Sequence, residues 1–444
     1  MASERCAAKR EKVYAWGRLP PREHDVVHAF FADEMVAAIT ARDKRPLLCR
    51  GLGRSYGDVG LNGGGYLLDA TRVDHVLSAD WGTGVVRAEA GLALDALLKV
   101  SVPRGWFLPV SPGTKFVTLG GAVANDVHGK NHETAGTIGR HVRRIGLVRS
   151  TGEILELSPE RDAALFAATV GGLGLTGIML WIELQLSPIR SAAMEVETLR
   201  TADLDGFFRL SAESADWPYS VAWVDGLARG RALGRGLFIR GRHCASGELV
   251  PHGDRGLTVP DAARHLLNKR TIALVNLFYR ARPRAAGRTT MHYDRFFFPL
   301  DSLLRWNRLY GRRGFFQHQS VVPMKNAPET VRRLLELSAE SGEPPYLAVL
   351  KVLGDRPSPG VLSFPMPGVT LALDFANRGE PTRRLLKRLC DTVAAAGGRL
   401  YPAKDATMSP DAFRAGYPDW RRVEANRDPA IMSDFWRRVA ADAA

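Results

Sequence analysis

The chain's 444 residues exceed what one hydrophobic core normally serves, so two domains are expected, and no apolar run reaches the roughly 20 residues that cross a membrane. Lysine and arginine number 61 against 47 aspartate and glutamate, a formal charge of +14 that points to nucleic acid, an anionic membrane surface or an anionic substrate. The arginines are dispersed and no zinc-finger, helix-turn-helix or RNA-binding signature occurs, so nucleic acid is not expected.

The cysteines and the N-terminal segment indicate a reducing compartment. Cys6, Cys49, Cys244 and Cys390 lie far apart without the spacing of metal ligands, so no structural zinc is expected. The N-terminal segment is charged and lacks an apolar core, so a secretory signal is not expected. We expect a cytoplasmic protein and leave peripheral membrane contact open.

The first elements lead to a loop rich in glycine and arginine. A helix is expected around Asp33–Ala41 and a strand over Pro46–Cys49. Three glycines and two arginines follow within Arg50–Asp58, a composition that suits a pyrophosphate, although a hairpin loop with solvated arginines has it too. The next expected elements are strands at Tyr66–Asp69 and Val85–Ala90 and a helix at Leu92–Val100.

The segment Val110–His132 combines glycine turns with acid and base side chains. Pro112-Gly113-Thr114 is a turn signal, and the small residues after Thr118 let the backbone approach an anionic ligand closely. Polar side chains then follow at Asn125, Asp126, His128, Lys130, Asn131 and His132. This order predicts a nucleotide cofactor with its reactive end nearby; the alternative is a glycine-rich surface loop. The His128-x-x-x-His132 spacing resembles a metal pair, but the intervening glycine and the loop context argue against a metal.

A second glycine cluster, Gly172-x-Gly174-x-x-Gly177, resembles a Rossmann fingerprint but lies in the wrong context. That fingerprint needs a strand before the glycines and a helix after them. Here the helical pattern Glu160–Thr169 comes first and the strand pattern Ile178–Leu186 follows. We therefore predict a glycine corner beside a cofactor. The preceding segments Arg144–Val148 and Glu153–Leu157 predict a hairpin.

Beyond a predicted domain boundary near Pro188, longer amphipathic segments replace the glycine loops. Helices are expected at Leu204–Ala215 and Pro328–Glu340. Asp261–Phe278 is helical in pattern, and it leads to a stretch that either contacts anionic lipid or is an exposed helix with a mobile loop. The basic residues of that stretch are Arg280, Arg282, Arg284 and Arg288.

The C-terminal half supplies candidate ligand-binding groups. Strand-like segments are expected at Phe296–Pro299, Phe316–Gln319 and Leu350–Lys351, and alternation places Gln317 and Gln319 on one face with His318 on the other. Two amides on one face suit a hydroxyl-rich ligand, although two solvent-facing glutamines are the alternative. Gly397–Asp405 predicts a turn, a short strand and a lysine, and a helix over Pro429–Ala441 ends the chain.

As a set, these motifs resemble those of the vanillyl-alcohol-oxidase-type family of FAD-dependent oxidases, and within it the branch that oxidises the ribose of a lipid-linked phosphosugar. The motifs are RGLGRSYGD, NGGG, the PGT…VT.GGA…D.HGKNH loop, TVGGLGLTGI, Trp306-Asn307-Arg308, GFFQHQ, LSFPMPG and RLYPAKD. The resemblance implies an α+β chain with a two-subdomain PCMH-type FAD-binding fold from residues 1–190 plus 398–444. Residues 191–397 would be an inserted α+β substrate domain, an antiparallel sheet flanked by helices.

The resemblance also implies which residues hold FAD. They are Arg50, Gly51, Leu52, Gly53, Arg54, Ser55, Tyr56, Gly57, Asp58, Pro112, Gly113, Thr114, Thr118, Gly120, Gly121, Asn125, Asp126, His128, Gly174, Gly177, Ile178 and Tyr401. Many relatives attach the flavin covalently through a histidine in the first loop. Arg54 stands at that place here, so non-covalent FAD is expected.

On the substrate side, the resemblance assigns catalytic roles to Lys404 and His128. Substrate contacts are assigned to Lys130, Trp223, Phe297, Gln317, Gln319, Lys351, Thr370 and Ala372. Three of these depart from the family: Ala372 replaces a cysteine over the flavin, Phe297 a tyrosine, and Thr370 an asparagine. Lys404 is the first candidate for stabilising charge or, if burial lowers its pKa, for the base; His128 is the rival base.

The implied reaction is oxidation of the 2-hydroxyl of a polyprenyl-phosphoryl ribose to a keto sugar. A short-chain reductase would then complete an epimerisation to the arabinose form, as part of arabinose supply to a cell wall. Two alternatives are an FAD oxidase of a free sugar, alditol or aldonolactone, and a basic binding protein with a vestigial cofactor loop.

Overall fold

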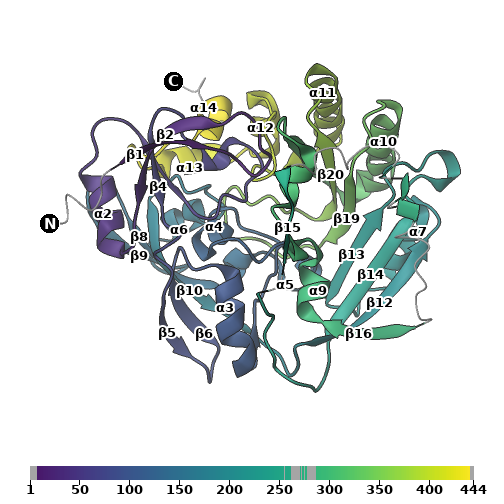
Figure 1. Ribbon diagram of the computed structural model, residues 1–444, viewed down its shortest axis with the longest axis horizontal. Coiled ribbons are helices and arrows are strands. Elements are labelled where there is room, and N and C mark those ends of the chain that lie inside the picture. Colours follow the sequence, from purple (N-terminus) through teal and green to yellow (C-terminus); the bar gives the residue numbers. More distant parts are fainter. Residues whose placement is uncertain are drawn as a thin grey trace.

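Three β-sheets carry most of the fold, and helices cover parts of each. The computed structural model describes residues 8–254, 256–261 and 287–440, together with 271, 273–274 and 276–277. The predicted α+β class is confirmed, with antiparallel sheets and packed helices (Figure 1). The helix expected over Asp261–Phe278, and Arg280, Arg282 and Arg284 after it, lie almost entirely outside the described residues.

The first lobe, residues 8–190 with residues 401–440, contains two of the sheets. A four-stranded sheet has the order β1-β2-β4-β3, in which β2, β4 and β3 run parallel. A five-stranded antiparallel sheet has the order β5-β6-β10-β8-β9. Their strands are β1 (Lys9–Val13), β2 (Arg22–His28), β3 (Leu47–Arg50), β4 (Tyr66–Asp69), β5 (Val76–Asp80), β6 (Val85–Glu89), β8 (Val142–Val148), β9 (Ile154–Leu157) and β10 (Ile178–Gln185). The hairpin expected from Arg144–Val148 and Glu153–Leu157 is present as β8–β9.

The helices of the first lobe are short and lie beside the glycine loops. They are α2 (Ala32–Thr40), α3 (Leu94–Ser101), α4 (Leu119–Ala124), α5 (His132–Ala135), α6 (Ala163–Thr169), α12 (Pro410–Gly416), α13 (Trp420–Asn426) and α14 (Asp434–Ala440). Because α6 precedes the glycine corner and β10 follows it, the predicted order of helix, glycines and strand is confirmed.

The second lobe is built on an eight-stranded antiparallel sheet of order β16-β12-β14-β13-β19-β20-β18-β21. Its strands are β12 (Ala193–Thr201), β13 (Tyr219–Val224), β14 (Gly236–His243), β16 (Arg288–His292), β18 (Phe315–Pro323), β19 (Leu347–Leu353), β20 (Gly368–Ala376) and β21 (Arg399–Leu400). The helices are α7 (Leu204–Ala212), α9 (Tyr293–Phe297), α10 (Ala327–Glu340) and α11 (Glu380–Ala395). Two minor pairs are β7 (Trp106–Phe107) with β11 (Ser187–Pro188), and β15 (Leu257–Thr258) with β17 (Leu303–Leu304).

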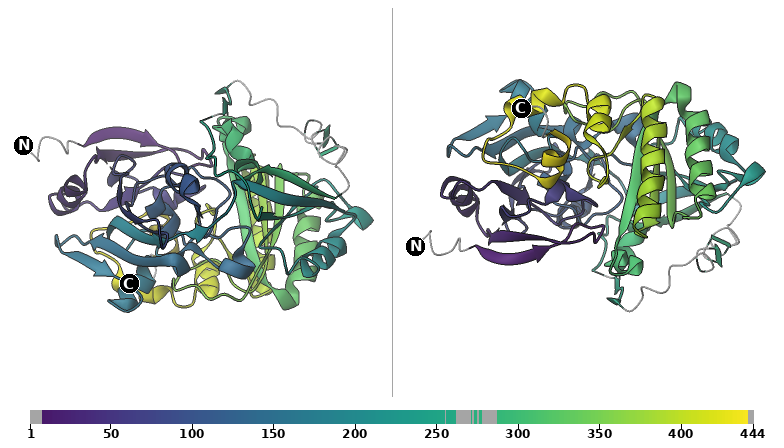
Figure 2. Two further views of the ribbon diagram at one scale, coloured as in Figure 1. Left: turned by 90° about the horizontal axis from the view of Figure 1, so that it is seen from below. Right: turned by 90° about the horizontal axis from the view of Figure 1, so that it is seen from above.

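Amphipathic helices α10 and α11 cover one face of this sheet, and the first lobe lies against the other (Figure 2). Apolar residues at helical spacing bury one side of each helix, for example Leu334 and Leu335 in α10 and Leu385 and Leu389 in α11. The central strand β18 is buried along nearly its whole length. One sheet face is therefore closed by helices, and the other is left to form a site with the first lobe.

The strand expected at Phe296–Pro299 is wrong, because the segment forms helix α9 followed by a 3₁₀ turn. Tyr293, Phe296 and Phe297 are buried at helical spacing, and the His292 side chain accepts a hydrogen bond from Asp294 N at the helix start. Aromatic residues favour strands, but a capped helix buries the same rings here. The expected C-terminal helix begins later, at Asp434, since residues before it pair with β3 through Leu47 and Ile431.

The C-terminal segment returns to the first lobe after β21 (Figure 1). β21 pairs with β18 in the large sheet, so sheet pairing continues to Leu400, just past the expected boundary at 397/398; the domain division stays a prediction. Within the described residues, none of the helices combines the length and apolar character that crossing a bilayer requires.

Arg438 of α14 fixes this returning segment through two carboxylates. Its Nη2 lies 2.7 Å from Asp58 Oδ1 and 3.0 Å from Asp405 Oδ2, and Asp405 is buried. Asp405 also accepts hydrogen bonds from the N–H groups of Thr407 and Met408. The ion cluster therefore ties the loop after β3 to the segment that carries Lys404.

Replacing Arg438 by methionine should lower the free energy of unfolding by about 2 kcal/mol, because it leaves a buried carboxylate without its counter-charge. This loss of stability is smaller than that expected for a fully buried ion pair, because the Arg438 side chain is 26% exposed. Urea titration would measure it. The control Lys387→Met breaks a pair whose side chains are 76% and 60% exposed and should change nothing measurable. Equal losses in the two variants would contradict the role of Arg438.

Candidate active site

A cavity of about 340 Å³ lies between the two lobes, where the glycine loops face the large sheet. Its first-lobe wall comes from the loop after β3, the 112–114 turn, α4 and the glycine corner before β10. Its second-lobe wall comes from β18, β19 and β20, with Tyr401, Ala403 and Lys404 at the junction. The cavity thus contains both the predicted phosphate-binding backbone and the predicted polar groups.

Glycines in the wall are required by close contacts on the protein side. A Cβ at Gly51 would lie 2.1 Å from Thr118 Oγ1, and one at Gly120 would lie 3.0 Å from the carbonyl oxygen of Ala90. A Cβ at Gly57 would lie 1.6 Å from the carbonyl oxygen of Asp405. The loop after β3 can therefore pack against α4 and the returning C-terminal segment only with glycine at these positions.

The same loop leaves hydrogen-bond donors free to meet a ligand. Among the described residues, no acceptor is found for the backbone N–H groups of Leu52, Gly53 and Arg54. The Oδ1 atom of Asn125, which lines the cavity, is buried without a partner. Buried polar groups are normally satisfied, and successive backbone N–H groups form concave anion sites. The backbone N–H donors fit the pyrophosphate of FAD, and the Asn125 oxygen, an acceptor, fits an N–H group on its ring edge.

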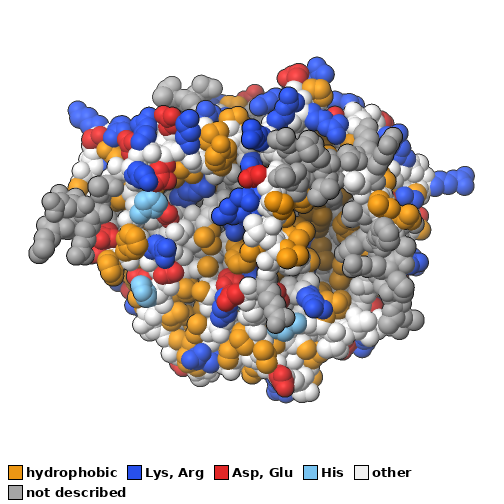
Figure 3. Space-filling view, viewed as in Figure 1, with side chains coloured by type: hydrophobic (Ala, Val, Ile, Leu, Met, Phe, Trp, Pro, Cys, Tyr) orange, Lys and Arg blue, Asp and Glu red, His pale blue; other side chains and the backbone are white. Residues whose placement is uncertain are grey.

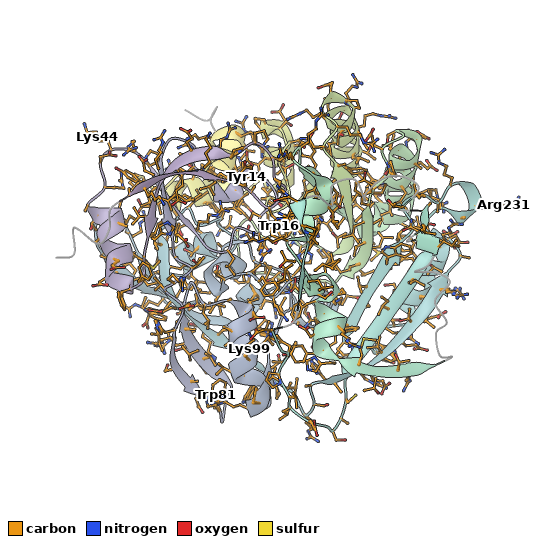
Figure 4. All side chains as sticks on the ribbon, in the orientation of Figure 1. Tyr14, Trp16, Lys44, Trp81, Lys99 and Arg231 are labelled. Atoms are coloured by element: carbon orange, nitrogen blue, oxygen red, sulfur yellow. The ribbon has the colours of Figure 1, made fainter. Side chains whose placement is uncertain are left out.

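Two arginines bring positive charge to this wall. Arg50 Nη2 donates to the carbonyl of Tyr14 at 2.8 Å, and burial lowers its pKa to about 10. Arg54 Nε donates to the carbonyl of Phe116 at 2.9 Å, and its guanidinium lies 4.1 Å from the ring centre of Trp16. Figure 4 labels Trp16 near the middle of the molecule, where the two lobes meet. Burial lowers the pKa of Arg54 as well, so a bound anion would relieve the cost of its burial.

The second-lobe wall follows from the register of three strands. Gln317 pairs with Asp374 and Gln319 with Ala372 across β18 and β20. Lys351 pairs with Thr370 across β19 and β20. Since alternate residues of a strand share a face, one face presents two amides, a hydroxyl, a lysine and a buried carboxylate. Both glutamines are buried, so the solvent-facing alternative is wrong.

Lys404 is placed by hydrogen bonds from both lobes. Tyr401 N donates to the carbonyl of Gln319 at 2.9 Å, and Tyr56 N donates to the carbonyl of Ala403 at 2.9 Å. The Lys404 Nζ then lies 3.8 Å from the ring centre of Tyr56. Burial lowers the pKa of Lys404, as does the charge of Lys351, while Asp374 raises it. The amine is therefore poised to change protonation state far more readily than an exposed lysine.

The pKa values of the other basic groups of the site are also lowered. Burial lowers the pKa of Lys351 to about 8. Burial, with the charges of Lys351, His132 and Lys404, holds the pKa of His128 well below its usual range. His128 Nε2 lies 3.3 Å from Gln319 Nε2, and His128 Nδ1 is buried without a partner. His128 is thus neutral at neutral pH.

Positive charge dominates the described residues that line the cavity. The lysines and arginines among them are Arg50, Arg54, Lys351 and Lys404, against the single carboxylate of Asp301. On the outer face shown in Figure 3, by contrast, basic side chains are scattered and not gathered in one patch. A part of the positive charge therefore lies inside the molecule, at the cavity, which fits an anionic cofactor or substrate.

The structure brings most of the predicted site residues together. Those that line the cavity are Arg50, Gly51, Leu52, Gly53, Arg54, Ser55, Tyr56, Gly57, Pro112, Gly113, Thr114, Thr118, Gly120, Gly121, Asn125, His128, Gly174, Gly177, Gln317, Gln319, Lys351, Thr370, Ala372, Tyr401 and Lys404. Six do not line it: Asp58, Asp126, Ile178, Lys130, Trp223 and Phe297. Their roles in binding stay predictions.

Several of these six have protein partners instead. Asp58 pairs with Arg438, and the Asp126 carboxylate accepts hydrogen bonds from Gly139 N and from the hydroxyls of Ser358 and Ser363. Lys130 Nζ donates to the carbonyls of Phe296 and Phe297. Short polar motifs therefore include residues that hold the loops in place.

Sequence reasoning missed Asp374 and Asp301 as site residues. Asp374 lies two residues from Ala372 and four from Thr370 on β20, so strand alternation from those two residues is the signal that would have found it. Asp301, which lines the cavity, accepts a hydrogen bond from Lys115 N at 2.8 Å. No short-range pattern marks Asp301, because its partners are distant in the chain.

Comparison with known proteins gives matches over the whole chain and over the cofactor loops. A family model described as FAD binding domain matches residues 28–158. The chain is 35% identical over 450 residues to decaprenylphosphoryl-beta-D-ribose oxidase of Mycolicibacterium smegmatis, a match that covers 97% of each chain. An uncharacterized protein in the mprA 5′ region of Streptomyces coelicolor is 34% identical and covers 78% of this chain and 100% of its own. L-gulonolactone oxidase of Mus musculus is 27% identical over 34% of each chain.

Replacing Gly51 by alanine should weaken FAD binding at least tenfold, roughly 1.4 kcal/mol, because the new methyl group forces the loop and Thr118 apart. Fluorescence titration of the apoprotein with FAD would measure the dissociation constant. The control is Gly253→Ala, since Gly253 is exposed and a Cβ added there would meet no atom within 4 Å. Unchanged affinity in Gly51→Ala would contradict the role of this loop.

Proposed function

The chain belongs to the decaprenylphosphoryl-β-D-ribose oxidase family of FAD-dependent oxidases, and we propose that it oxidises the 2-hydroxyl of the ribose in a polyprenyl-phosphoryl ribose to a keto group. The observation that carries this proposal is one cavity in which free backbone donors face a strand surface of two amides, a hydroxyl and a lysine, with Lys404 at the junction of the lobes. Amides and hydroxyls suit a sugar, and ammonium groups suit its phosphate.

Bound FAD supplies the acceptor for the hydride that leaves the carbon of the alcohol. The chain's own residues must hold the sugar, exclude water and take the hydroxyl proton. We assign the sugar to Gln317, Gln319 and Thr370 on the sheet face, and the anionic group to Lys351. The loop after β3 and α4 hold the cofactor, with Arg54 in the place where a covalent link would require a histidine. FAD is therefore non-covalent, and denaturation should release it intact.

Lys404 is the group that takes the proton. A general base works best when its pKa lies near the working pH, and burial brings the pKa of Lys404 down towards neutrality. His128 is a weaker candidate, because its protonation would place a third positive charge beside Lys351 and Lys404. His128 is better suited to orient the sugar through its contact with Gln319.

The substrate class is tested by anaerobic bleaching of the flavin. Polyprenyl-phosphoryl ribose should bleach the bound flavin at low concentration, whereas free ribose, alditols and aldonolactones should not. The partial likeness to L-gulonolactone oxidase makes the free-sugar reaction the second candidate. Bleaching by a free sugar or lactone alone would favour that reaction. A purified protein that holds no FAD would favour a non-enzymatic basic protein.

The wider setting is part of the same proposal. A keto sugar on a lipid carrier requires a reductase of the short-chain class to yield the arabinose form, and a lipid-linked substrate requires access to a membrane surface. The matching assay supplies the oxidised product to a nicotinamide-dependent reductase and measures formation of the arabinose form.

Replacing Lys404 by methionine should lower the rate constant of flavin reduction by about 10²- to 10⁴-fold, the usual contribution of a positioned base, while the flavin stays bound. Anaerobic single-turnover kinetics measure the rate, and visible absorbance measures flavin content. The control Lys325→Met removes an exposed lysine and should leave both values unchanged. A near wild-type rate of flavin reduction in Lys404→Met would refute the assignment.

A further inference from the structure

A buried carboxylate, that of Asp374 on β20, lies behind the lysine side of the cavity. Asp374 is fully buried, and its Oδ1 accepts a hydrogen bond from Gln317 Nε2. Its Oδ2 accepts a longer hydrogen bond, 3.5 Å, from the hydroxyl of Tyr310. Among the described residues, no lysine or arginine lies within ion-pair distance of this carboxylate. A buried carboxylate that lacks a contacting cation is costly to the fold.

Side chains connect Asp374 to Lys404 through the cavity wall. The Gln317 side chain that donates to Asp374 also lies beside the Tyr56 side chain, and both Gln317 and Tyr56 line the cavity. The Lys404 Nζ in turn lies over the ring of Tyr56, 3.8 Å from the ring centre. The carboxylate, the amide, the phenol and the amine therefore form one contiguous set, although Asp374 itself does not line the cavity.

The charges around this set are simple. The titratable groups that face Lys404 or Asp374 are Lys351 from β19, His128 from the central loop, Tyr56 from the first loop, and Tyr310 and Tyr346 beside Asp374. Burial raises the pKa of Tyr56 and Tyr310, so these phenols are neutral. His128 is neutral as well. Within this set, Asp374 is the group that can balance a positive charge on Lys404.

We propose that Asp374 is a positioning residue for the oxidation, which stabilises the ammonium form of Lys404 as Lys404 accepts the proton of the substrate hydroxyl. The proposal rests on the proposed function, in which Lys404 is the base. In the step, the O–H bond breaks, its electron pair stays on the oxygen, and the proton forms a new N–H bond on Lys404. Asp374 takes no proton; its negative charge and its link through Gln317 and Tyr56 favour the product of the transfer.

A merely structural role of Asp374 gives a different expectation. If the carboxylate only held Gln317 in place, its replacement would loosen the sheet face and raise KM or lower stability. It would leave the protonation of Lys404 unchanged. The pKa of Lys404 therefore separates the two roles, because it responds to charge and not to packing alone.

The experiment compares Asp374→Asn with wild type as FAD-loaded enzymes. Competitive acetylation with acetic anhydride over a range of pH, read by peptide mass spectrometry, gives the pKa of Lys404 without any sugar. We expect this pKa to fall by about one unit, the usual minimum for losing a nearby opposite charge. The Lys404 pKa should fall and not rise, because Asp374 favours the charged form of the amine. The kcat should fall about tenfold, and the acidic limb of its pH profile should move down by the same unit, because a weaker base is deprotonated at lower pH.

Asp225→Asn is the matched control, since Asp225 is another buried carboxylate of the second lobe, paired with Arg235 at 2.7 Å. It should lower stability without moving the Lys404 pKa. An unchanged Lys404 pKa in Asp374→Asn, or the same change in Asp225→Asn, would overturn the proposal. If Asp374→Asn loses its flavin, the variant Tyr310→Phe is used in its place. Removing the Tyr310 hydroxyl raises the pKa of Asp374 and reduces its negative charge, so the Lys404 pKa should fall by a smaller amount. An unchanged Lys404 pKa would again overturn the proposal.

The two arms of the experiment separate this proposal from the proposed function. The acetylation measurement succeeds or fails without substrate. If the Lys404 pKa falls but no sugar bleaches the flavin, the proposed substrate is wrong and the charge coupling stands. If the kinetic profile of the variant shifts on its alkaline limb instead, Lys404 acts as a cation and not as the base, and the proton-transfer step is refuted.

Discussion

The register of β18, β19 and β20 is the constraint on which the site depends. Side chains alternate between the two faces of a strand, so a shift of one residue in any of these strands would move its polar groups to the opposite face. The pairs Gln317 with Asp374 and Lys351 with Thr370 show that each of the three strands places at least one of these polar residues on the face that meets the first lobe. The helices α10 and α11 favour this register, because apolar residues of the sheet pack against them.

Desolvation gives these polar groups their chemical properties. Lys351 and Lys404 line the cavity, and burial lowers the pKa of both amines. The same burial raises the pKa of Asp374. A buried amine gains from a buried carboxylate nearby, because the negative charge favours the ammonium form of the amine. A site with this arrangement can take up a proton from an alcohol without the high cost of an isolated buried charge.

The sequence predicted the elements of the site well where a local pattern carried the information. The glycine loops, the strand-borne Gln317 and Gln319, and the helix-before-strand order around Gly174 all follow from turn chemistry and periodicity, and all are present. Phe297 was misplaced because aromatic residues favour strands in isolation, whereas here a helix buries them. Asp301 was missed for another reason: its partner Lys115 is distant in sequence, and only the fold brings the two near. Asp374 was missed although strand alternation from Thr370 and Ala372 places it on their face.

The position of Lys404 also limits how the two lobes can move. The short segment from Tyr401 to Ala403 is held at one end by the carbonyl of Gln319 in the large sheet and at the other by Tyr56 N in the first loop. Separating the lobes by even a small distance would break one of these hydrogen bonds and displace the amine from the ring of Tyr56. Two hydrogen bonds to opposite lobes therefore fix the position of the segment that carries the amine, as a preorganised proton acceptor requires.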